Sequence, residues 1–183
     1  GGAGMLGRTI RAEHARGGWL SPSLADLDIT DGPAVTRWFE AERPHLVIHC
    51  AAATDVDGCE SDEKQAFAVN ADGCENIARA AATVGARLVA FSTDYVFSGE
   101  GERPYLVDDL AEPKTVYGKS KLEGEARIQA FATDYLIARI SWLYGPGGPS
   151  FVHTMLRLGA SEGPALKVVE DQVGSPTSTL AIA

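Results

Sequence analysis

The fold is decided by the stretch Leu88-Val89-Ala90-Phe91-Ser92-Thr93-Asp94-Tyr95-Val96-Phe97. Its first four residues are apolar and predict a buried strand, which we expect over residues 87–92. Hydroxyl side chains follow directly, at the point where this strand would end. A continuous apolar strand of this kind is typical of a parallel sheet that is covered on both faces.

Apolar runs alternate with helical patterns on both sides of this stretch. We expect further strands over residues 46–50 and 135–140, and a short one over 166–169. Helices are expected over residues 5–15, 63–84, 116–131 and 151–158. This βαβα order predicts an α/β fold with a Rossmann-type, doubly wound parallel sheet.

The segment Tyr117-Gly118-Lys119-Ser120-Lys121 opens the third of these helices. Residues four apart share one helix face, so the Tyr117 hydroxyl and the Lys121 ammonium are expected side by side. A fixed positive charge stabilises a phenolate, so we expect a pKa of Tyr117 below the usual value of about 10. Such a tyrosine can pass a proton to or from a carbonyl oxygen, which the Thr93 hydroxyl can hold. Thr93, Tyr117 and Lys121 are therefore the predicted catalytic residues.

A second motif, Gly1-Gly2-Ala3-Gly4-Met5-Leu6-Gly7, has the spacing G-x-x-G-x-x-G. Glycines 1, 4 and 7 let the backbone approach a pyrophosphate at a helix N-terminus, so we predict a dinucleotide site that includes Gly1, Gly4, Met5, Leu6 and Gly7. A merely flexible glycine-rich terminus is the alternative. Such a loop follows a strand, and none precedes it here, while residues 178–183 look like the opening of a helix. We therefore expect this chain to be part of a longer protein.

The residues that follow the glycine loop bear on the choice of cofactor. NAD-preferring folds carry an acid about 20 residues beyond the loop, bound to the ribose 2′-hydroxyl. Here Trp19-Leu20-Ser21-Pro22-Ser23 contains no acid, which permits NADPH. Arg8 is a candidate partner for the 2′-phosphate, and an ordinary solvated helix arginine is the alternative. We expect NADPH or NADH as cofactor, with NADPH accepted at least as well as NADH.

Further segments stand in a set order along the chain: Ala51-Ala52-Ala53-Thr54-Asp55-Val56-Asp57-x-x-Glu60, Tyr117-Gly118-Lys119-Ser120-Lys121-x-x-Gly124-Glu125, Ser141-Trp142-Leu143-Tyr144-Gly145 and Asp171-Gln172-Val173-Gly174-Ser175-Pro176-Thr177. With Ser92 to Phe97, they resemble the dTDP-4-dehydrorhamnose reductase family of the short-chain dehydrogenase/reductase superfamily. The resemblance covers nearly all of the chain. It implies NAD(P)H-dependent reduction of the 4-keto group of dTDP-4-dehydro-L-rhamnose to dTDP-L-rhamnose.

The resemblance also implies roles for single residues. Tyr117 would protonate the nascent alkoxide, Lys121 would bind the nicotinamide ribose, and Thr93 would hydrogen-bond the substrate oxygen. The implied cofactor-binding residues also include Asp28, Ile29, Ala51, Ala52, Ala53 and Asn70. The implied substrate-binding residues are Thr54, Val56, Thr93, Tyr95 and Trp142. Core packing is the alternative for Trp142, and a helix-surface position is the alternative for Asn70. A scaffold role is the alternative for Thr54, Val56 and Tyr95. Thr9 stands where a metal-binding acid of some relatives is expected, so no metal is predicted.

Three rival functions can be weighed on the same residues. Related dehydratases carry Thr-Asp-Glu after the strand, whereas this chain has Thr93-Asp94-Tyr95, so the second acid is missing. Related epimerases have Val-Tyr-Gly where Val96-Phe97-Ser98 stands, which disfavours an epimerase without excluding it. A non-catalytic binding module, such as the regulatory subunit of methionine adenosyltransferase, stays open, because an intact set of catalytic residues does not prove turnover.

Composition limits the remaining possibilities. The 183 residues carry a net charge of −9, which disfavours nucleic acid and an anionic membrane surface as partners. Three cysteines without C-x-x-C spacing predict reduced thiols and a cytoplasmic protein.

We predict a dinucleotide-binding domain over residues 1–148 and the start of a smaller, incomplete substrate-binding region over 149–183. A nucleotide sugar is the expected partner and a homodimer is possible. The carboxylates of Glu60 and Glu125 are expected on solvated faces.

Overall fold

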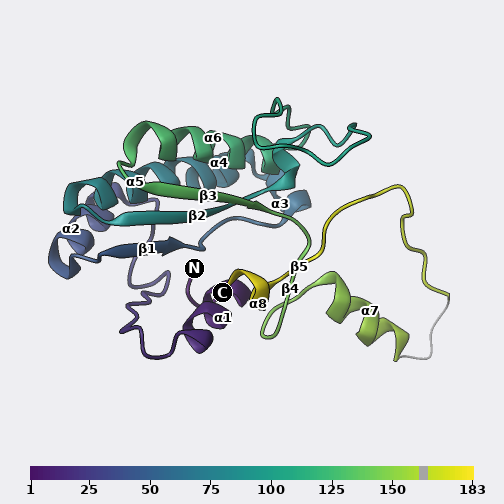
Figure 1. Ribbon diagram of the computed structural model, residues 1–183, viewed down its shortest axis with the longest axis horizontal. Helices are drawn as coiled ribbons and strands as arrows, with labels where there is room; N and C mark the ends of the chain where they lie inside the picture. Colours follow the sequence, from purple (N-terminus) through teal and green to yellow (C-terminus); the bar gives the residue numbers. More distant parts are fainter. Residues whose placement is uncertain (161–164) are drawn as a thin grey trace. The chain divides into compact units, whose positions relative to one another are not determined.

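The computed structural model describes residues 1–160 and 165–183 and divides into two compact units. The first unit comprises Gly1 and residues 22–139, and the second comprises residues 2–21 and 140–183. Figure 1 shows the elements of both units. The domain division expected at residue 148 stays a prediction.

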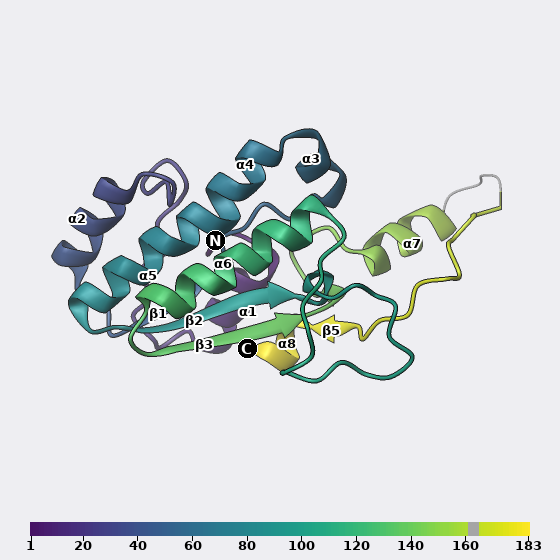
Figure 2. The ribbon, with the colours of Figure 1, turned by 90° about the horizontal axis from the view of Figure 1, so that it is seen from above.

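The first unit is built on a three-stranded sheet in the order β1-β2-β3, with β1 at Leu46–His49, β2 at Arg87–Thr93 and β3 at Tyr135–Ile140. β1 and β2 are parallel, with His49 opposite Ala90. In Figure 2 the arrows of β2 and β3 also point the same way. The α/β fold with a parallel sheet is therefore confirmed, and each of these strands lies where the sequence predicts it.

The helices of the first unit are α2 (Gly32–Glu42), α3 (Val56–Ser61), α4 (Glu63–Phe67), the π-helical turn η1 (Ala68–Asp72), α5 (Gly73–Val84) and α6 (Val116–Phe131). The helix expected over residues 63–84 is interrupted only by η1. α2 was not predicted from the sequence, although Asp31 caps it by accepting a hydrogen bond from the Ala34 N–H at 3.0 Å. α5 and α6 lie side by side over one face of the sheet (Figures 1 and 2).

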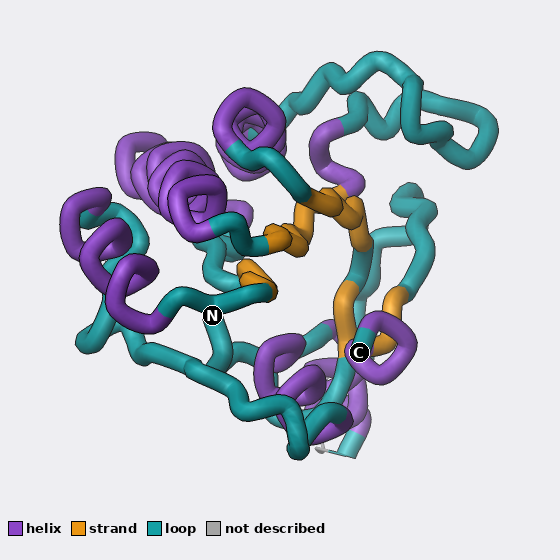
Figure 3. Tube along the Cα trace, turned by 60° about the vertical axis from the view of Figure 1, so that its left-hand side comes forward, coloured by secondary structure: helices purple, strands orange, loops and turns teal. Residues whose placement is uncertain are grey.

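The core of the first unit lies between this sheet face and the helices. Leu88 and Ala90 of β2 are buried against side chains of α2, α5 and α6. The fully buried members of the cluster include Val35, Ala78 and Ala81. Because alanines line α5, this helix can pack closely on its neighbours without creating voids. The tube in Figure 3 shows these helices stacked beside the strands.

The second unit contains α1 (Met5–Glu13), β4 (Leu143–Tyr144), α7 (Phe151–Gly159), β5 (Thr177–Ser178) and α8 (Thr179–Ile182). β4 and β5 form a parallel pair, and the buried hydroxyls of Thr9 and Thr179 lie 3.0 Å apart, which joins α1 to α8. The strand expected over residues 166–169 is wrong. Residues 165–169 form neither helix nor strand, and the side chains of Val168 and Val169 are exposed, so this apolar run does not contribute to a sheet core. Among the described residues, no helix has the length and apolar character needed to cross a membrane.

Candidate active site

The carboxyl end of β2 carries the first predicted catalytic residue, Thr93. A short 3-10 helix, η2 (Asp94–Val96), begins directly after it. The Thr93 hydroxyl donates to the Asp94 carboxylate at 3.1 Å and accepts from the Tyr95 N–H at 3.2 Å. Both bonds hold the Thr93 side chain in one orientation at the edge of the sheet. Burial of Thr93 removes competing solvent from this hydroxyl.

Tyr117 lies in the first turn of α6. The hydroxyl of Thr115 caps this helix by accepting from the Gly118 N–H at 3.0 Å. The half-buried Tyr117 ring packs edge-to-face on Tyr95, with ring centroids 5.6 Å apart. The Thr93 side chain is close enough to lower the pKa of the Tyr117 phenol, against the effect of burial. The structure thus brings Thr93, Tyr95 and Tyr117 together from two elements.

Two glycines allow α6 to approach the site so closely. A Cβ atom on Gly118 would lie 2.2 Å from the Tyr95 carbonyl oxygen, and one on Gly124 would lie 2.1 Å from the Asn70 carbonyl oxygen. Neither backbone oxygen can be displaced by a simple side-chain rotation. Only glycine at these two positions lets α6 pack against the carbonyl oxygens of Tyr95 and Asn70. This packing fixes the position of Tyr117 and Lys121, which lie on the same helix.

Gly124→Ala is expected to lower the free energy of unfolding by about 2 kcal/mol, because the added methyl forces α6 away from the π-helical turn. Urea denaturation measures this loss. Gly159→Ala is the matched control, since a Cβ on this glycine of α7 meets no atom within 4 Å. The control should be neutral or slightly stabilising, as alanine favours the helix. Equal unfolding midpoints for wild type and Gly124→Ala would contradict the close packing.

Lys121 lies one turn beyond Tyr117 and is buried. Its ammonium donates to the carbonyl oxygen of Phe91 at 2.8 Å, which ties α6 to the end of β2. Burial lowers the pKa of Lys121. Two further buried side chains lie near Lys121, since His49 Nε2 is 3.5 Å from Cys74 Sγ and the charge of Lys121 acts on both. Burial, and then the charge of Lys121, lowers the pKa of His49 to about 3, so this imidazole is neutral.

The expected effect of Lys121 on Tyr117 is wrong for this structure. The pKa of Tyr117 is raised and not lowered, because burial of the phenol disfavours its charged form and outweighs the contact with Thr93. The negative charge of Asp94 raises it further. Tyr117 therefore keeps its proton at neutral pH, which is the form that can donate to a developing alkoxide.

Asn70 connects the loop after β1 to α6. Its side-chain amide accepts from the Ala53 N–H at 2.9 Å and donates to the Ala53 carbonyl at 3.0 Å. It also donates to the Ser120 hydroxyl at 3.0 Å, and Ser120 in turn donates to the Tyr117 carbonyl at 2.8 Å. Asn70 is buried, so the alternative of a helix-surface residue is wrong. Sequence reasoning assigned no role to Ser120, although its place three residues after Tyr117 puts both on neighbouring turns.

Two carboxylates expected on solvated faces have structural partners instead. Glu125 is buried and binds the Arg139 guanidinium at 2.6 Å and 3.0 Å. Glu60 is exposed, yet it accepts from the Val116 N–H at 2.7 Å at the start of α6. The prediction is wrong for Glu125 because its partner comes from β3, which no local pattern reveals.

Single residues of the glycine loop have properties that suit pyrophosphate binding, which stays a prediction. A Cβ on Gly1 would lie 2.3 Å from the Ala51 nitrogen, so only glycine leaves room against the loop after β1. Gly4 is the N-cap of α1 and makes no side-chain cap hydrogen bond, which leaves the first amides of that helix to bind a phosphate. Leu6 and Gly7 are buried in α1, and Met5 packs against Gly148.

The remaining predicted site residues have varied surroundings. The Asp28 carboxylate accepts from the backbone and hydroxyl of Thr30 at 2.9 Å and 2.8 Å, and Ile29 packs on Gly73. Ala51 and Ala52 are half-buried after β1, Thr54 is exposed, and Val56 begins α3. Trp142 belongs to the second unit, is 44% exposed, and packs against Gly174. No group of three histidine, cysteine or acidic residues in the described part of the chain could hold a metal.

Comparisons with known proteins identify the family of this chain. The model of one protein family, described as the RmlD substrate binding domain, matches residues 1–183. The chain belongs to this family. A dTDP-4-dehydrorhamnose reductase of Streptomyces griseus is 46% identical over 186 residues, which cover 100% of this chain and 61% of that protein. The resemblance stated from the sequence is thereby confirmed.

Similar solved structures confirm the fold. A dTDP-4-dehydrorhamnose reductase of Clostridium acetobutylicum matches with a TM-score of 0.94 and 45% identity. Another, of Bacillus anthracis in complex with NADP, matches with a TM-score of 0.95 and 40% identity. Each alignment covers 100% of this chain and 65% of the other. The chain thus spans less than two thirds of the length of these relatives.

Proposed function

We propose that this protein is an NAD(P)H-dependent reductase that converts dTDP-4-dehydro-L-rhamnose to dTDP-L-rhamnose. The observation that carries the proposal is the convergence of Thr93, Tyr117 and Lys121 at the end of β2 and the start of α6. The names and close similarity of the relatives support the substrate, and the glycine loop supports the dinucleotide. Residues 1–148 would bind the cofactor, and residues 149–183 would begin the substrate-binding region.

The side chains would divide the work as follows. When bound, a reduced nicotinamide dinucleotide would provide the hydride for the keto carbon. The Thr93 hydroxyl holds the carbonyl oxygen, and Tyr117 donates its proton to that oxygen as negative charge develops. Lys121 would bind the nicotinamide ribose hydroxyls and would place its positive charge near the developing oxyanion. Asn70 and Ser120 hold the loop after β1 and the start of α6 in register.

The proposal also assigns the residues that would contact the sugar and the adenine, and the compartment of the protein. Thr54, Val56, Tyr95 and Trp142 are the proposed sugar-side residues, and Asp28 and Ile29 the adenine-side residues. A single acid, Asp94, follows Thr93, which argues against the elimination of water that related dehydratases perform. We place the enzyme in the cytoplasm, where its three free cysteines would stay reduced.

The test is turnover by the intact protein. NADPH is mixed with dTDP-4-dehydro-L-rhamnose, the loss of nicotinamide absorbance is followed, and the product is identified by mass spectrometry. Substrate-dependent oxidation with formation of dTDP-L-rhamnose is the expected result. Cofactor binding without oxidation of NADPH would overturn the reductase proposal in favour of a binding module.

A further inference from the structure

The short helix α3 lies beside the amino end of α6, the helix that carries Tyr117 (Figure 2). One carboxylate joins the two helices, because Glu60 near the end of α3 accepts a hydrogen bond from the Val116 N–H at 2.7 Å. Val116 is the first residue of α6, so its N–H has no acceptor within the helix. A carboxylate also suits this position electrostatically, since the positive end of the helix dipole lies there.

Two acceptors hold the first turn of α6, and they come from different parts of the chain. The Thr115 hydroxyl accepts from the Gly118 N–H at 3.0 Å, and Glu60 accepts from the Val116 N–H. Tyr117 lies between these two amides in the sequence. The Thr115 cap adjoins α6 in the chain and moves with it, whereas the Glu60 hydrogen bond fixes the turn against a separate helix.

α3 is itself fixed to the loop after β1. Its N-cap residue Asp55 accepts from the Gly58 N–H at 3.1 Å. The buried Cys59 thiol lies 3.9 Å from the Ala53 carbonyl oxygen, which makes a weak hydrogen bond. Glu60 follows Cys59 directly and so extends from an anchored helix. A continuous path of contacts therefore runs from the loop that carries the proposed sugar-side residues to the first turn of α6.

We infer that Glu60 is a positioning residue for the proposed reaction, because it holds the first turn of α6 where the Tyr117 hydroxyl can meet the substrate oxygen. This inference rests on the proposed function. Glu60 acts through the backbone of Val116, the residue before Tyr117. A proton donor must lie within about 2.6–3.2 Å of its acceptor. A displacement of about 1 Å in such a group can cost about 100-fold in rate.

The first test is steady-state kinetics on the intact protein with NADPH and dTDP-4-dehydro-L-rhamnose. Glu60→Ala should lower kcat by about 10- to 100-fold, because the first turn of α6 loses this tether. The Kd for NADPH should change less than about twofold, since Lys121 keeps its own hydrogen bond to Phe91. Glu60→Gln should recover most of kcat, because its amide oxygen can still accept from the Val116 N–H.

Glu63→Ala is the matched control, since Glu63 is an exposed glutamate three residues further along the chain. It should behave as wild type. A double mutant then separates positioning from a general loss of structure. In the Tyr117→Phe background, Glu60→Ala should lower kcat by less than about twofold, because no hydroxyl is left to position. The inference is overturned by wild-type kcat in Glu60→Ala, or by an equal loss with and without the Tyr117 hydroxyl.

Amide hydrogen exchange tests the tether without turnover. The Val116 N–H should exchange faster in Glu60→Ala than in wild type, because its acceptor is gone, and at the wild-type rate in Glu63→Ala. Unchanged exchange in Glu60→Ala would overturn the inference. If wild type shows the protected amide but does not reduce this sugar nucleotide, the proposed function fails, which is a separate outcome.

Discussion

Tyr117→Phe is expected to lower kcat by about 10³-fold, within the range for loss of a general acid. The substitution removes one hydroxyl, and the phenyl ring can keep its edge-to-face contact with Tyr95. Burial raises the pKa of Tyr117, so the wild-type phenol carries the proton at neutral pH that the alkoxide requires. Steady-state kinetics at saturating NADPH and sugar nucleotide would measure the loss, with the Kd of NADPH determined in parallel.

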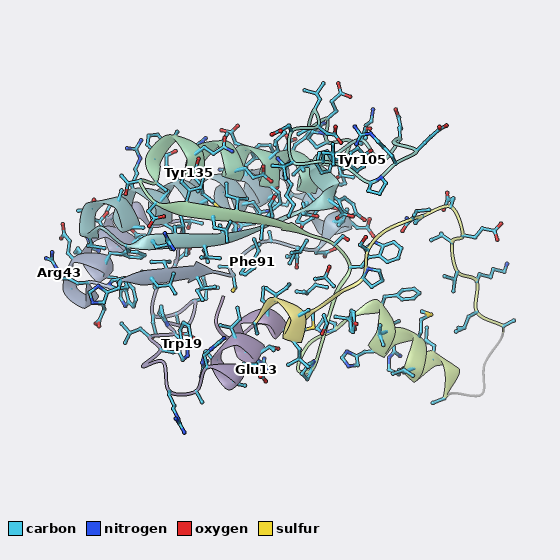
Figure 4. All side chains as sticks on the ribbon, in the orientation of Figure 1. Glu13, Trp19, Arg43, Phe91, Tyr105 and Tyr135 are labelled. Carbon is cyan, nitrogen blue, oxygen red and sulfur yellow. The ribbon has the colours of Figure 1, made fainter. Side chains whose placement is uncertain are left out.

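Tyr135→Phe provides the control for this substitution. Tyr135, which is labelled in Figure 4, is the first residue of β3. Its side chain is 41% exposed. Its loss of the same hydroxyl should leave kcat and Kd unchanged. A Tyr117→Phe enzyme with wild-type kcat would remove Tyr117 from the proposed mechanism, whatever its cofactor affinity.

Lys121→Ala should weaken cofactor binding and catalysis together, with kcat/KM reduced by about 10²- to 10³-fold. The buried ammonium is fixed by its hydrogen bond to Phe91, so its charge is pre-organised toward the site. Because burial lowers the pKa of Lys121, the wild-type rate should also fall at alkaline pH as this lysine loses its proton. Calorimetry with NADPH and a pH profile of kcat/KM would measure both effects.

Lys119→Ala is the matched control on the same helix, because Lys119 is exposed. It should behave as wild type in both measurements. A Lys121→Ala enzyme with reduced kcat but an unchanged Kd for NADPH would argue against the proposed contact with the nicotinamide ribose. The proton donor would then stay as proposed, and only the role of the lysine would change.

The sequence alone was enough for the elements that carry Thr93 and Tyr117. The strand before Thr93 is a continuous apolar run, and Tyr117 and Lys121 have the four-residue spacing of one helix face. Both are local signals, since each depends on neighbours within a turn or a strand length. By contrast, α2 was not predicted from the sequence. Its apolar face is small, and the structure shows its role, because Val35 and Phe39 pack in one core cluster with residues of α5.

Local periodicity thus determined the order of strands and helices, and the helical spacing of Tyr117 and Lys121. The tertiary structure alone decided which groups those residues meet. Lys121 binds the Phe91 carbonyl, Glu125 pairs with Arg139, and Arg11 meets Ser21. These contacts join residues 10 to 30 positions apart in the chain, and the burial that raises the pKa of Tyr117 likewise comes from several elements at once. Burial and long-range pairing arise only when separate elements pack, so no short stretch of the sequence contains them.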